Sequence, residues 1–373
     1  MIFRKKGPKV VISGYYGFDN CGDEAVLYAI IHSLRRLRPD VRITVLSGNP
    51  EKTQKLYGVR AIDRWSPFRV GLELLRCSLF ISGGGSLIQD VTSVKSADYY
   101  LSVIFLGTLL ARKTMIYGQG VGPLSSKKVR ARTARTLGRC DVITVRDEGS
   151  ASLLREIGVK REITVTCDPV MALSYEDIDR GEIRRYLEDI NILDDEGRKR
   201  KPLFLVTLRC WGDNGHLPEV AKLLDEQARK GWDVLLAPMH FPQDMQAIDM
   251  VGNLMTERLY CLGTQLSARQ FLALSAYADK VFSMRLHGLI FAMAVGAPMV
   301  GLSYDPKVIA FARLSGLEAS CFSLEEFSWK KAARLIEEME SAPLAMLRYQ
   351  EGRRRELRVA AWGMARQAAD LLK

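Results

Sequence analysis

The sequence has no apolar run long enough to cross a lipid bilayer. A spanning helix needs about 18 or more uncharged, mostly apolar residues, and the longest candidate, Tyr99 to Ala111, is shorter and typical of a buried helix. The basic start, Met1 to Lys9, is followed by a brief apolar run, Val10 to Ile12, which is too short for a secretory signal. We therefore expect a cytoplasmic protein.

Paired cysteine motifs are also missing. The seven cysteines are widely spaced and form no CxxC pair, which favours free thiols in a reducing compartment. The same scatter argues against a structural zinc site, and we expect neither a metal nor a bound cofactor. The residues concerned are Cys21, Cys77, Cys140, Cys167, Cys210, Cys261 and Cys321.

Acidic residues are scarce in the first part of the chain. Residues 1–170 hold 27 Lys and Arg against 15 Asp and Glu, a net charge of +12, whereas the remaining residues have a net charge of −1. This excess predicts a polyanionic partner, with a plain solvated surface as the alternative. The strongly basic segment 127–135 favours an anionic membrane surface. Nucleic acid is not expected, because no aromatic-rich strand or helix-turn-helix pattern accompanies the charge.

What the sequence does contain is an alternation of short apolar strands and amphipathic helices. The strands are almost continuously apolar and bounded by glycine, as in parallel sheets that helices cover on both faces. The pattern predicts an α/β protein of two Rossmann-type domains, with the ligand in a central cleft at the strand carboxyl ends. We expect the domains at 1–175 and 202–344, a charged connector at 176–201, and a terminal helix, 345–373, packing back on the first domain.

Three glycine-rich loops follow strands of the first domain. They comprise Gly14–Glu24, Ser82–Ser86 and Tyr117–Pro123, and none has the GxGxxG or GK[ST] spacing of a nucleotide-phosphate loop. Two carboxylates at the start of the first helix suit sugar hydroxyls better than phosphate. We predict one acceptor site, with N-capping by Asp23 as the structural alternative. Its candidate residues are Tyr15 and Tyr16 for stacking, and Asn20, Asp23, Glu24, Gly84, Gly85 and Gln119.

An Arg-Leu-His segment follows the strand at 280–283 of the second domain. Arg285 can bind a carboxylate or phosphate through two hydrogen bonds, close to the free N–H groups of a helix start. His287 lies two residues on, as a general acid or base, and Lys307 follows the next strand. Arg146 follows a strand of the first domain as a further cation. Both residues also have a purely structural alternative. His287 could be a core histidine, and Arg146 could form a salt bridge with Asp147 or Glu148.

These residues, taken in order, resemble the polysaccharide pyruvyl transferase family. The matching pieces are Gly14-Tyr15-Tyr16-Gly17, Asn20-Cys21-Gly22-Asp23-Glu24, Gly83-Gly84-Gly85-Ser86, Gly118-Gln119-Gly120-Val121-Gly122-Pro123, Arg146-Asp147 and Arg285-Leu286-His287-Gly288. Within the family the chain looks most similar to the bacterial CsaB-type branch, which pyruvylates the secondary cell-wall polymer that anchors S-layer proteins.

The resemblance implies a GT-B-like fold and a ketal pyruvyltransferase that uses phosphoenolpyruvate as a co-substrate. The implied acceptor is β-linked N-acetylmannosamine on N-acetylglucosamine, carried on a polyprenyl diphosphate and modified across O4 and O6. Arg146, Arg285, Leu286 and His287 would contact the donor, with Lys307 assigned from its position. Catalysis would then depend on His287, Arg285, Arg146 and Asp23. A lipid-linked acceptor and a basic first domain together predict peripheral binding to the inner face of the cell membrane.

Two other functions compete with this one. A GT-B glycosyltransferase that uses a nucleotide sugar would share the fold, but Arg285-Leu286-His287 is less natural where a ribose must be held by acids. A non-catalytic nucleic-acid or membrane-binding module would explain the basic first half. It would leave the three glycine loops and the Arg-Leu-His segment without a role.

Overall fold

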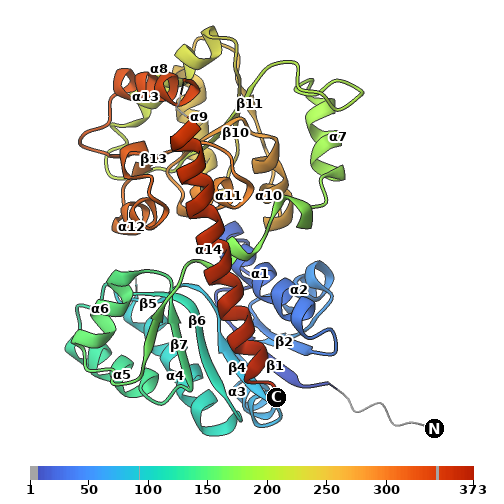
Figure 1. Cartoon of the computed structure of the whole chain (residues 1–373), viewed down its shortest axis with the longest axis vertical. Coiled ribbons are helices and arrows are strands. Elements are labelled where there is room, and N and C mark those ends of the chain that lie inside the picture. Colours follow the sequence, from blue (N-terminus) through green and yellow to red (C-terminus); the bar gives the residue numbers. More distant parts are fainter. Residues whose placement is uncertain (1–6, 92, 342–343) are drawn as a thin grey trace. The chain divides into compact units, whose positions relative to one another are not determined.

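The computed structural model describes residues 7–91, 93–341 and 344–373. The chain divides into two compact units, each built around its own parallel sheet (Figure 1). Unit 1 comprises Met1–Ala172 and Leu357–Lys373, and unit 2 comprises Leu173–Glu356. The segment 176–201, predicted as a connector, therefore lies within unit 2, and the terminal helix changes unit at residue 357 rather than at 345.

The sheet of unit 1 has the order β3-β2-β1-β4-β6-β7-β8, with β5 paired to β6. All pairings are parallel. Because β1, β4 and β6 are neighbours, the segments that follow them meet at one edge, as the three glycine-rich loops predict. The strands are β1 Lys9–Ser13, β2 Arg42–Ser47, β3 Arg60–Asp63, β4 Leu79–Ser82, β5 Gly85–Ile88, β6 Thr114–Val121, β7 Val142–Val145 and β8 Ile163–Val165.

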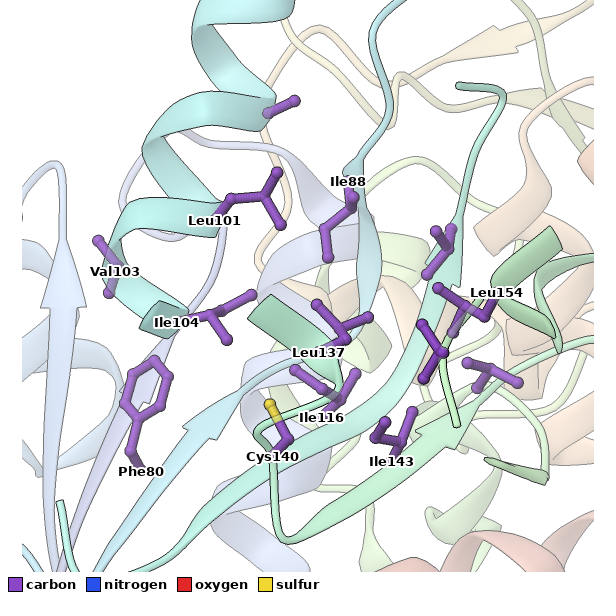
Figure 2. Packing of buried hydrophobic residues seen from close by; sticks show 14 of the residues in the cluster. Phe80, Ile88, Leu101, Val103, Ile104, Ile116, Leu137, Cys140, Ile143 and Leu154 are labelled. Atoms are coloured by element: carbon purple, nitrogen blue, oxygen red, sulfur yellow. The ribbon is translucent and has the colours of Figure 1, made fainter. Parts of the chain in front are cut away.

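The helices of unit 1 pack apolar side chains against this sheet. Figure 2 shows part of the resulting core, in which Leu101 and Ile104 of α4 lie near Ile116 of β6 and Ile88 of β5. Burial of such side chains is the main source of stability. The helices are α1 Cys21–Leu37, α2 Pro50–Tyr57, α3 Pro67–Leu75, α4 Val94–Leu110, α5 Lys127–Leu137 and α6 Glu148–Glu156, followed by the 3₁₀ turn η1 Pro169–Ala172.

Unit 2 repeats the architecture with the sheet order β11-β10-β9-β12-β13-β14. Its strands are β9 Leu203–Thr207, β10 Asp233–Leu236, β11 Tyr260–Cys261, β12 Lys280–Ser283, β13 Met299–Ser303 and β14 Cys321–Ser323. Its helices are α7 Gly181–Asp189, α8 Leu217–Arg229, α9 Met245–Leu254, α10 Ala268–Tyr277, α11 Leu286–Val295, α12 Pro306–Ser315 and α13 Trp329–Glu340, with 3₁₀ turns η2 Tyr175–Asp177 and η3 Glu318–Ser320. The carboxyl ends of β10, β9, β12 and β13 therefore share one edge.

The long terminal helix, α14 Leu344–Asp370, returns to unit 1 with its last part. The indole Nε1 of Trp362 donates to the carbonyl of Ala172 at 3.1 Å, and the Cys167 thiol donates to the carbonyl of Leu357 at 3.1 Å. Buried alanines at 361, 365 and 368 bring the helix close to its neighbours. The predicted return of the C-terminal helix to the first domain is confirmed. Within the described ranges, no helix combines the length and hydrophobicity of a membrane span.

One of the predicted glycine loops is largely a strand. β6 does not stop at Tyr117 but continues to Val121, and every residue of it is buried. The partner strands explain the difference, because β5 and β7 both pair with the stretch around Gln119. The glycines at 118 and 120 are needed for close packing instead. A Cβ at Gly120 would lie 2.7 Å from the guanidine carbon of Arg146.

Candidate functional site

In unit 1, Asp23 lies in the first turn of α1 beside the start of β5. A Cβ on Gly85 would come within 2.6 Å of the Asp23 carboxylate, so the two loops touch only because residue 85 has no side chain. Gly85 also has a φ of +90°, which favours glycine. The structure thus brings together Asp23 and Gly85, two of the predicted acceptor residues, at the carboxyl edge of the sheet.

Asn20, not Asp23, caps helix α1. Its side-chain oxygen accepts hydrogen bonds from the backbone N–H groups of Gly22 (3.1 Å) and Asp23 (3.3 Å). This arrangement satisfies amides that a helix start leaves without partners. The alternative role of Asp23 as the cap is wrong, and Asn20 has that structural role, while its predicted sugar contact stays a prediction.

Two other predicted acceptor residues are enclosed by protein. The ring of Tyr16 is fully buried, packed where a Cβ on Gly14 or Gly83 would collide with it, so it offers no face to a sugar. Glu24 is 8% exposed, and its carboxylate accepts from the Gly17 N–H (2.7 Å) and the Tyr57 hydroxyl (2.5 Å). Burial raises the pKa of the Glu24 carboxyl, against the effect of both hydrogen bonds. The structure assigns both side chains to the interior.

Gly84, Gln119 and Tyr15 also differ from their predicted roles. Gly84 packs against Val26 and Pro169, where a Cβ would lie 3.0 to 3.2 Å from their side chains. The Gln119 side chain is fully buried, at odds with a contact to a bulky acceptor. Tyr15 stacks on Phe18, with ring centroids 4.4 Å apart, so one of its faces is covered. Burial raises the pKa of the Tyr15 hydroxyl, and the nearby Asp23 carboxylate adds to that effect.

Buried polar atoms without hydrogen-bond partners in the described part of the chain lie near the carboxyl ends of β1, β4 and β6. They are the Tyr16 hydroxyl, the Ser82 hydroxyl and both amide atoms of Gln119. An unsatisfied buried polar group costs about 1–3 kcal/mol, and such groups are rare in folded proteins. Their concentration at the carboxyl ends of β4 and β6 marks this edge as a polar site rather than a packed core.

Sequence reasoning missed Arg64, which lies just beyond β3 at the same edge. Its side chain is 5% exposed, and its guanidinium donates to the Gly14 carbonyl at 3.1 Å. Four aromatic rings lie 4.2 to 5.2 Å from the guanidine carbon, those of Phe18, Trp65, Tyr99 and Tyr100. Within the described ranges it forms no ion pair. No motif pointed to it, because β3 itself escaped prediction.

Arg146 follows β7 in unit 1 and is 7% exposed. Its guanidinium donates to the Ser86 hydroxyl at 2.9 Å and to the Asp147 carboxylate at 3.3 Å, and it lies across Gly120. Asp147 in turn caps α6 by accepting from the Ser150 N–H. The salt bridge to Asp147, which was the structural alternative for Arg146, therefore forms. Arg146 also joins the Gly83–Ser86 loop to β6 and β7, which are the elements that carry the predicted site.

In unit 2, Arg285 is held by an aspartate that the sequence did not reveal. Asp244, 1% exposed, lies in the loop between β10 and α9. Its carboxylate accepts from Nε of Arg285 at 3.1 Å and also pairs with Nη2. It further accepts from the backbone N–H groups of Met239 (3.1 Å) and His240 (3.0 Å). Charged pairs with this geometry fix a guanidinium in one orientation.

His287 is half-buried in the first turn of α11, next to that fixed arginine. Its ring centroid lies 6.2 Å from that of Phe291 one turn on, and its Nε2 atom is buried. The Ser283 hydroxyl donates to the Arg285 carbonyl at 2.6 Å and also contacts the Thr207 hydroxyl. Arg285, Leu286 and His287 are all half-buried at the strand end, so the structure positions the predicted segment as one unit.

A second arginine that sequence reasoning missed stands on the neighbouring strand. Arg209 follows β9, and its Nη1 donates to the Tyr304 hydroxyl at 2.8 Å beyond β13. Its guanidinium also lies over the rings of Tyr304 and Trp211, at 4.5 and 5.1 Å. The signal was present, since Arg209 follows a predicted strand as Arg285 does. Lys307 lies further out, 42% exposed, and pairs with Asp305 at 3.2 Å.

We expect Asp244→Asn to weaken donor binding. Asparagine removes the charge that orients Arg285 and leaves a mostly buried cation without its partner, which costs about 3 kcal/mol. KM for an anionic substrate that Arg285 binds should rise at least about tenfold, with a smaller change in kcat, and Tm should fall. Asp279→Asn, at the start of β12, is the matched control and should leave KM near the wild-type value. Equal KM values for both variants would contradict the positioning role of Asp244.

We expect Gly288→Ala to displace the Arg285–His287 segment. A Cβ there would lie 2.3 Å from the Ser283 hydroxyl and 2.9 Å from that of Thr207, so α11 must shift. Overpacking of this kind costs about 1–3 kcal/mol, and kcat/KM should fall about tenfold or more. Gly252→Ala in α9, where the nearest atom is 3.7 Å away, is the control. Wild-type kinetics in Gly288→Ala would show that the position of α11 is unimportant.

No metal centre accompanies these residues: in the described ranges, no group of three His, Cys, Asp or Glu side chains could hold an ion. Two surface pockets of unit 2, of about 400 and 420 Å³, are lined by none of the predicted residues. The structure therefore offers two candidate sites, one within each unit. One is the polar edge around Asp23 in unit 1, and the other is the Arg285–His287 edge in unit 2.

Comparison with known protein families identifies one that matches this chain. A family model described as polysaccharide pyruvyl transferase matches residues 20–306. None of the curated proteins matches the chain.

Solved structures are similar over almost the whole chain. UDP-GlcNAc 2-epimerase from Neisseria meningitidis bound to UDP-GlcNAc has a TM-score of 0.64 at 12% identity, covering 98% of this chain and 99% of that one. Anabaena HepE in complex with UDP-glucose has a TM-score of 0.58 at 13% identity, and the match covers 98% of this chain and 96% of that one. A glycosyltransferase from Rickettsia africae has a TM-score of 0.58 at 12% identity, and the match covers 99% of this chain and 96% of that one. These similarities confirm the predicted GT-B-like α/β fold.

Proposed function

The chain belongs to the polysaccharide pyruvyl transferase family, and we propose that it transfers pyruvate from phosphoenolpyruvate to a lipid-linked amino sugar. The product is a 4,6-ketal, and phosphate is released. The observation that carries the proposal is the Arg285–Asp244 pair beside His287. It combines an oriented anion-binding guanidinium with a proton donor at one strand edge.

The donor is assigned to unit 2. Phosphoenolpyruvate carries a carboxylate and a phosphate, and it needs cations in fixed positions. Arg285 supplies one such cation, and it stands at the N-terminus of the ten-residue helix α11, where free N–H groups favour anions. Arg209 and Lys307 are further cations at the ends of neighbouring strands. Arg146 of unit 1 is assigned to the donor by family resemblance.

The acceptor is assigned to unit 1. Asp23 lies beside Gly85, at the same edge of the sheet as the unsatisfied atoms of Tyr16, Ser82 and Gln119. A carboxylate there suits the hydroxyl groups of a sugar and can take a proton from one of them. The resemblance to the CsaB-type branch supports β-N-acetylmannosamine on N-acetylglucosamine, carried on a polyprenyl diphosphate. It also supports a place in secondary cell-wall polymer synthesis for S-layer anchoring, at the inner face of the membrane.

The proposed reaction has two stages. His287 gives a proton to the methylene carbon of phosphoenolpyruvate, which makes C2 an oxocarbenium-like centre. One sugar hydroxyl forms a bond to C2 while Asp23 takes its proton. The C2–O bond to phosphate then breaks, and the phosphate takes the bonding electron pair and the proton held by Asp23, so that it leaves as HPO4²⁻. The second hydroxyl closes the ring, and its proton returns to His287, so atoms and charge balance.

Ligand binding tests the donor assignment independently of the acceptor. We expect phosphoenolpyruvate to raise the melting temperature of the protein, because a ligand that binds only the folded state stabilises it. UDP should give no shift. The shift with phosphoenolpyruvate should disappear in Arg285→Ala. A shift with UDP alone would contradict the proposal and favour a glycosyltransferase that uses a nucleotide sugar.

A further inference from the structure

Helix α3 of unit 1 is apolar on two opposite faces. Its inner face buries Val70 and Leu74 against the core. Its outer face carries Phe68, Leu72 and Leu75, which are spaced by four and three residues and so share one side of the helix. Phe68 is 81% exposed and Leu75 is 62% exposed. A helix covered on one side only does not normally present this second apolar stripe to water.

The stripe extends beyond the N-terminal end of α3. Trp65, 62% exposed, precedes the helix. We name the set Trp65, Phe68, Leu72 and Leu75 the α3 outer face (Figure 1 shows α3 in unit 1). Contiguous exposed apolar side chains of this size mark an interaction surface.

Cations surround this face, and no exposed acid of α3 accompanies them. Arg69 and Arg76 are exposed on α3, and Arg112 follows α4, where its backbone N–H contacts the carbonyl of Cys77. In the described part of the chain these three arginines form no ion pair. The acid of α3, Glu73, is buried and already paired with Lys9 and Arg60.

We propose that the α3 outer face docks on an anionic lipid bilayer. Large apolar side chains flanked by arginines match the boundary between acyl chains and anionic headgroups. A second copy of the chain fits less well, because a symmetric contact would bring Arg69, Arg76 and Arg112 against their own copies. The net charge of +12 on residues 1–170 adds long-range attraction to the same surface.

The α3 outer face is continuous with the proposed acceptor site of unit 1. The Trp65 ring lies 4.9 Å from that of Tyr99 and 5.1 Å from the guanidine carbon of Arg64. Arg64 reaches the Gly14 carbonyl, at the start of the loop that leads to Asp23. The inference rests on the proposed function to this extent: a lipid-linked sugar would then enter from the docked side, past Trp65 and Arg64.

Vesicle co-sedimentation tests the docking surface with the full-length protein. Wild type should bind phosphatidylglycerol vesicles, bind pure phosphatidylcholine weakly, and lose binding as salt is added. Phe68→Asp with Leu75→Asp should lower the partition coefficient about tenfold or more. Arg69→Gln with Arg76→Gln should lower it about 25-fold, at about fivefold per cation. Met250→Asp with Leu254→Asp, on exposed positions of α9 in unit 2, is the matched control and should bind as wild type.

Turnover of a water-soluble, short-chain acceptor separates docking from catalysis. The Phe68 and Leu75 double variant should keep wild-type turnover in solution while losing vesicle binding. Loss of vesicle binding with no turnover in any variant would sink the proposed function and keep the docking surface. Unchanged vesicle binding in both double variants would overturn the docking proposal. A wild-type dimer that the Phe68 and Leu75 changes convert to a monomer would also overturn it, in favour of self-association.

Discussion

Replacing His287 with alanine is expected to lower kcat by about 10²–10⁴-fold, the usual contribution of a positioned general acid. The proposed reaction begins with proton transfer to the methylene carbon of the donor, and His287 is the half-buried group beside Arg285 that can supply the proton. Phosphate release is the measurement. The thermal shift with phosphoenolpyruvate should persist, because Arg285 and Asp244 still orient the anion.

His32→Asn provides the control for His287→Ala. His32 lies in the middle of α1, with its ring 6.5 Å from that of Trp362, and has no part in the proposed chemistry. The control should turn over at the wild-type rate per folded molecule. Phosphate release within a few-fold of wild type in His287→Ala would remove this residue from the mechanism.

The adjacent acids Asp23 and Glu24 are expected to behave differently when each is made neutral. Asp23→Asn should lower kcat by about 10²–10⁴-fold with the fold retained, because the proposed base is lost. Glu24→Gln should keep most of the activity and lose about 1–2 kcal/mol of stability, because one of its two hydrogen bonds must rearrange. Parallel kinetics and thermal unfolding of the two variants measure the contrast.

The raised pKa of Glu24 gives this contrast a pH signature. The folded protein holds the Glu24 proton to a higher pH than the unfolded chain does, so this group stabilises the fold at low pH. That contribution is lost as the pH rises through the folded-state pKa. Wild type should therefore lose stability relative to Glu24→Gln as the pH rises from about 4.5, the ordinary value for glutamate. If Asp23→Asn and Glu24→Gln lost activity equally, the proposal that Asp23 alone acts as the base would be contradicted.

The strands could be predicted because their apolar runs are short and bounded by glycine. The strand predicted at 280–283 is β12, which has these limits in the structure. β6 could not be delimited, because Gly118 and Gly120 look like a loop until β5 and β7 are seen to pair with them.

The candidate site could be predicted where chemistry and position coincide in one segment. Arg285, Leu286 and His287 are three consecutive residues at a strand end, and the structure holds them together there, half-buried. Asp244 could not be found, since it lies 41 residues away and meets Arg285 only through the adjacency of β10, β9 and β12. The sequence also shows that Tyr16 and Glu24 are polar without showing that they are buried.

Mass spectrometry of a reconstituted reaction tests the central claim most directly. The protein is incubated with phosphoenolpyruvate and a synthetic lipid-diphosphate disaccharide of N-acetylmannosamine on N-acetylglucosamine. The account predicts a product that carries one pyruvyl ketal, with one phosphate released for each ketal formed, and neither product nor phosphate with His287→Ala. An unmodified disaccharide, from a protein that phosphoenolpyruvate stabilises, would contradict the proposed acceptor. An unmodified disaccharide and stabilisation by UDP alone would contradict pyruvyl transfer itself.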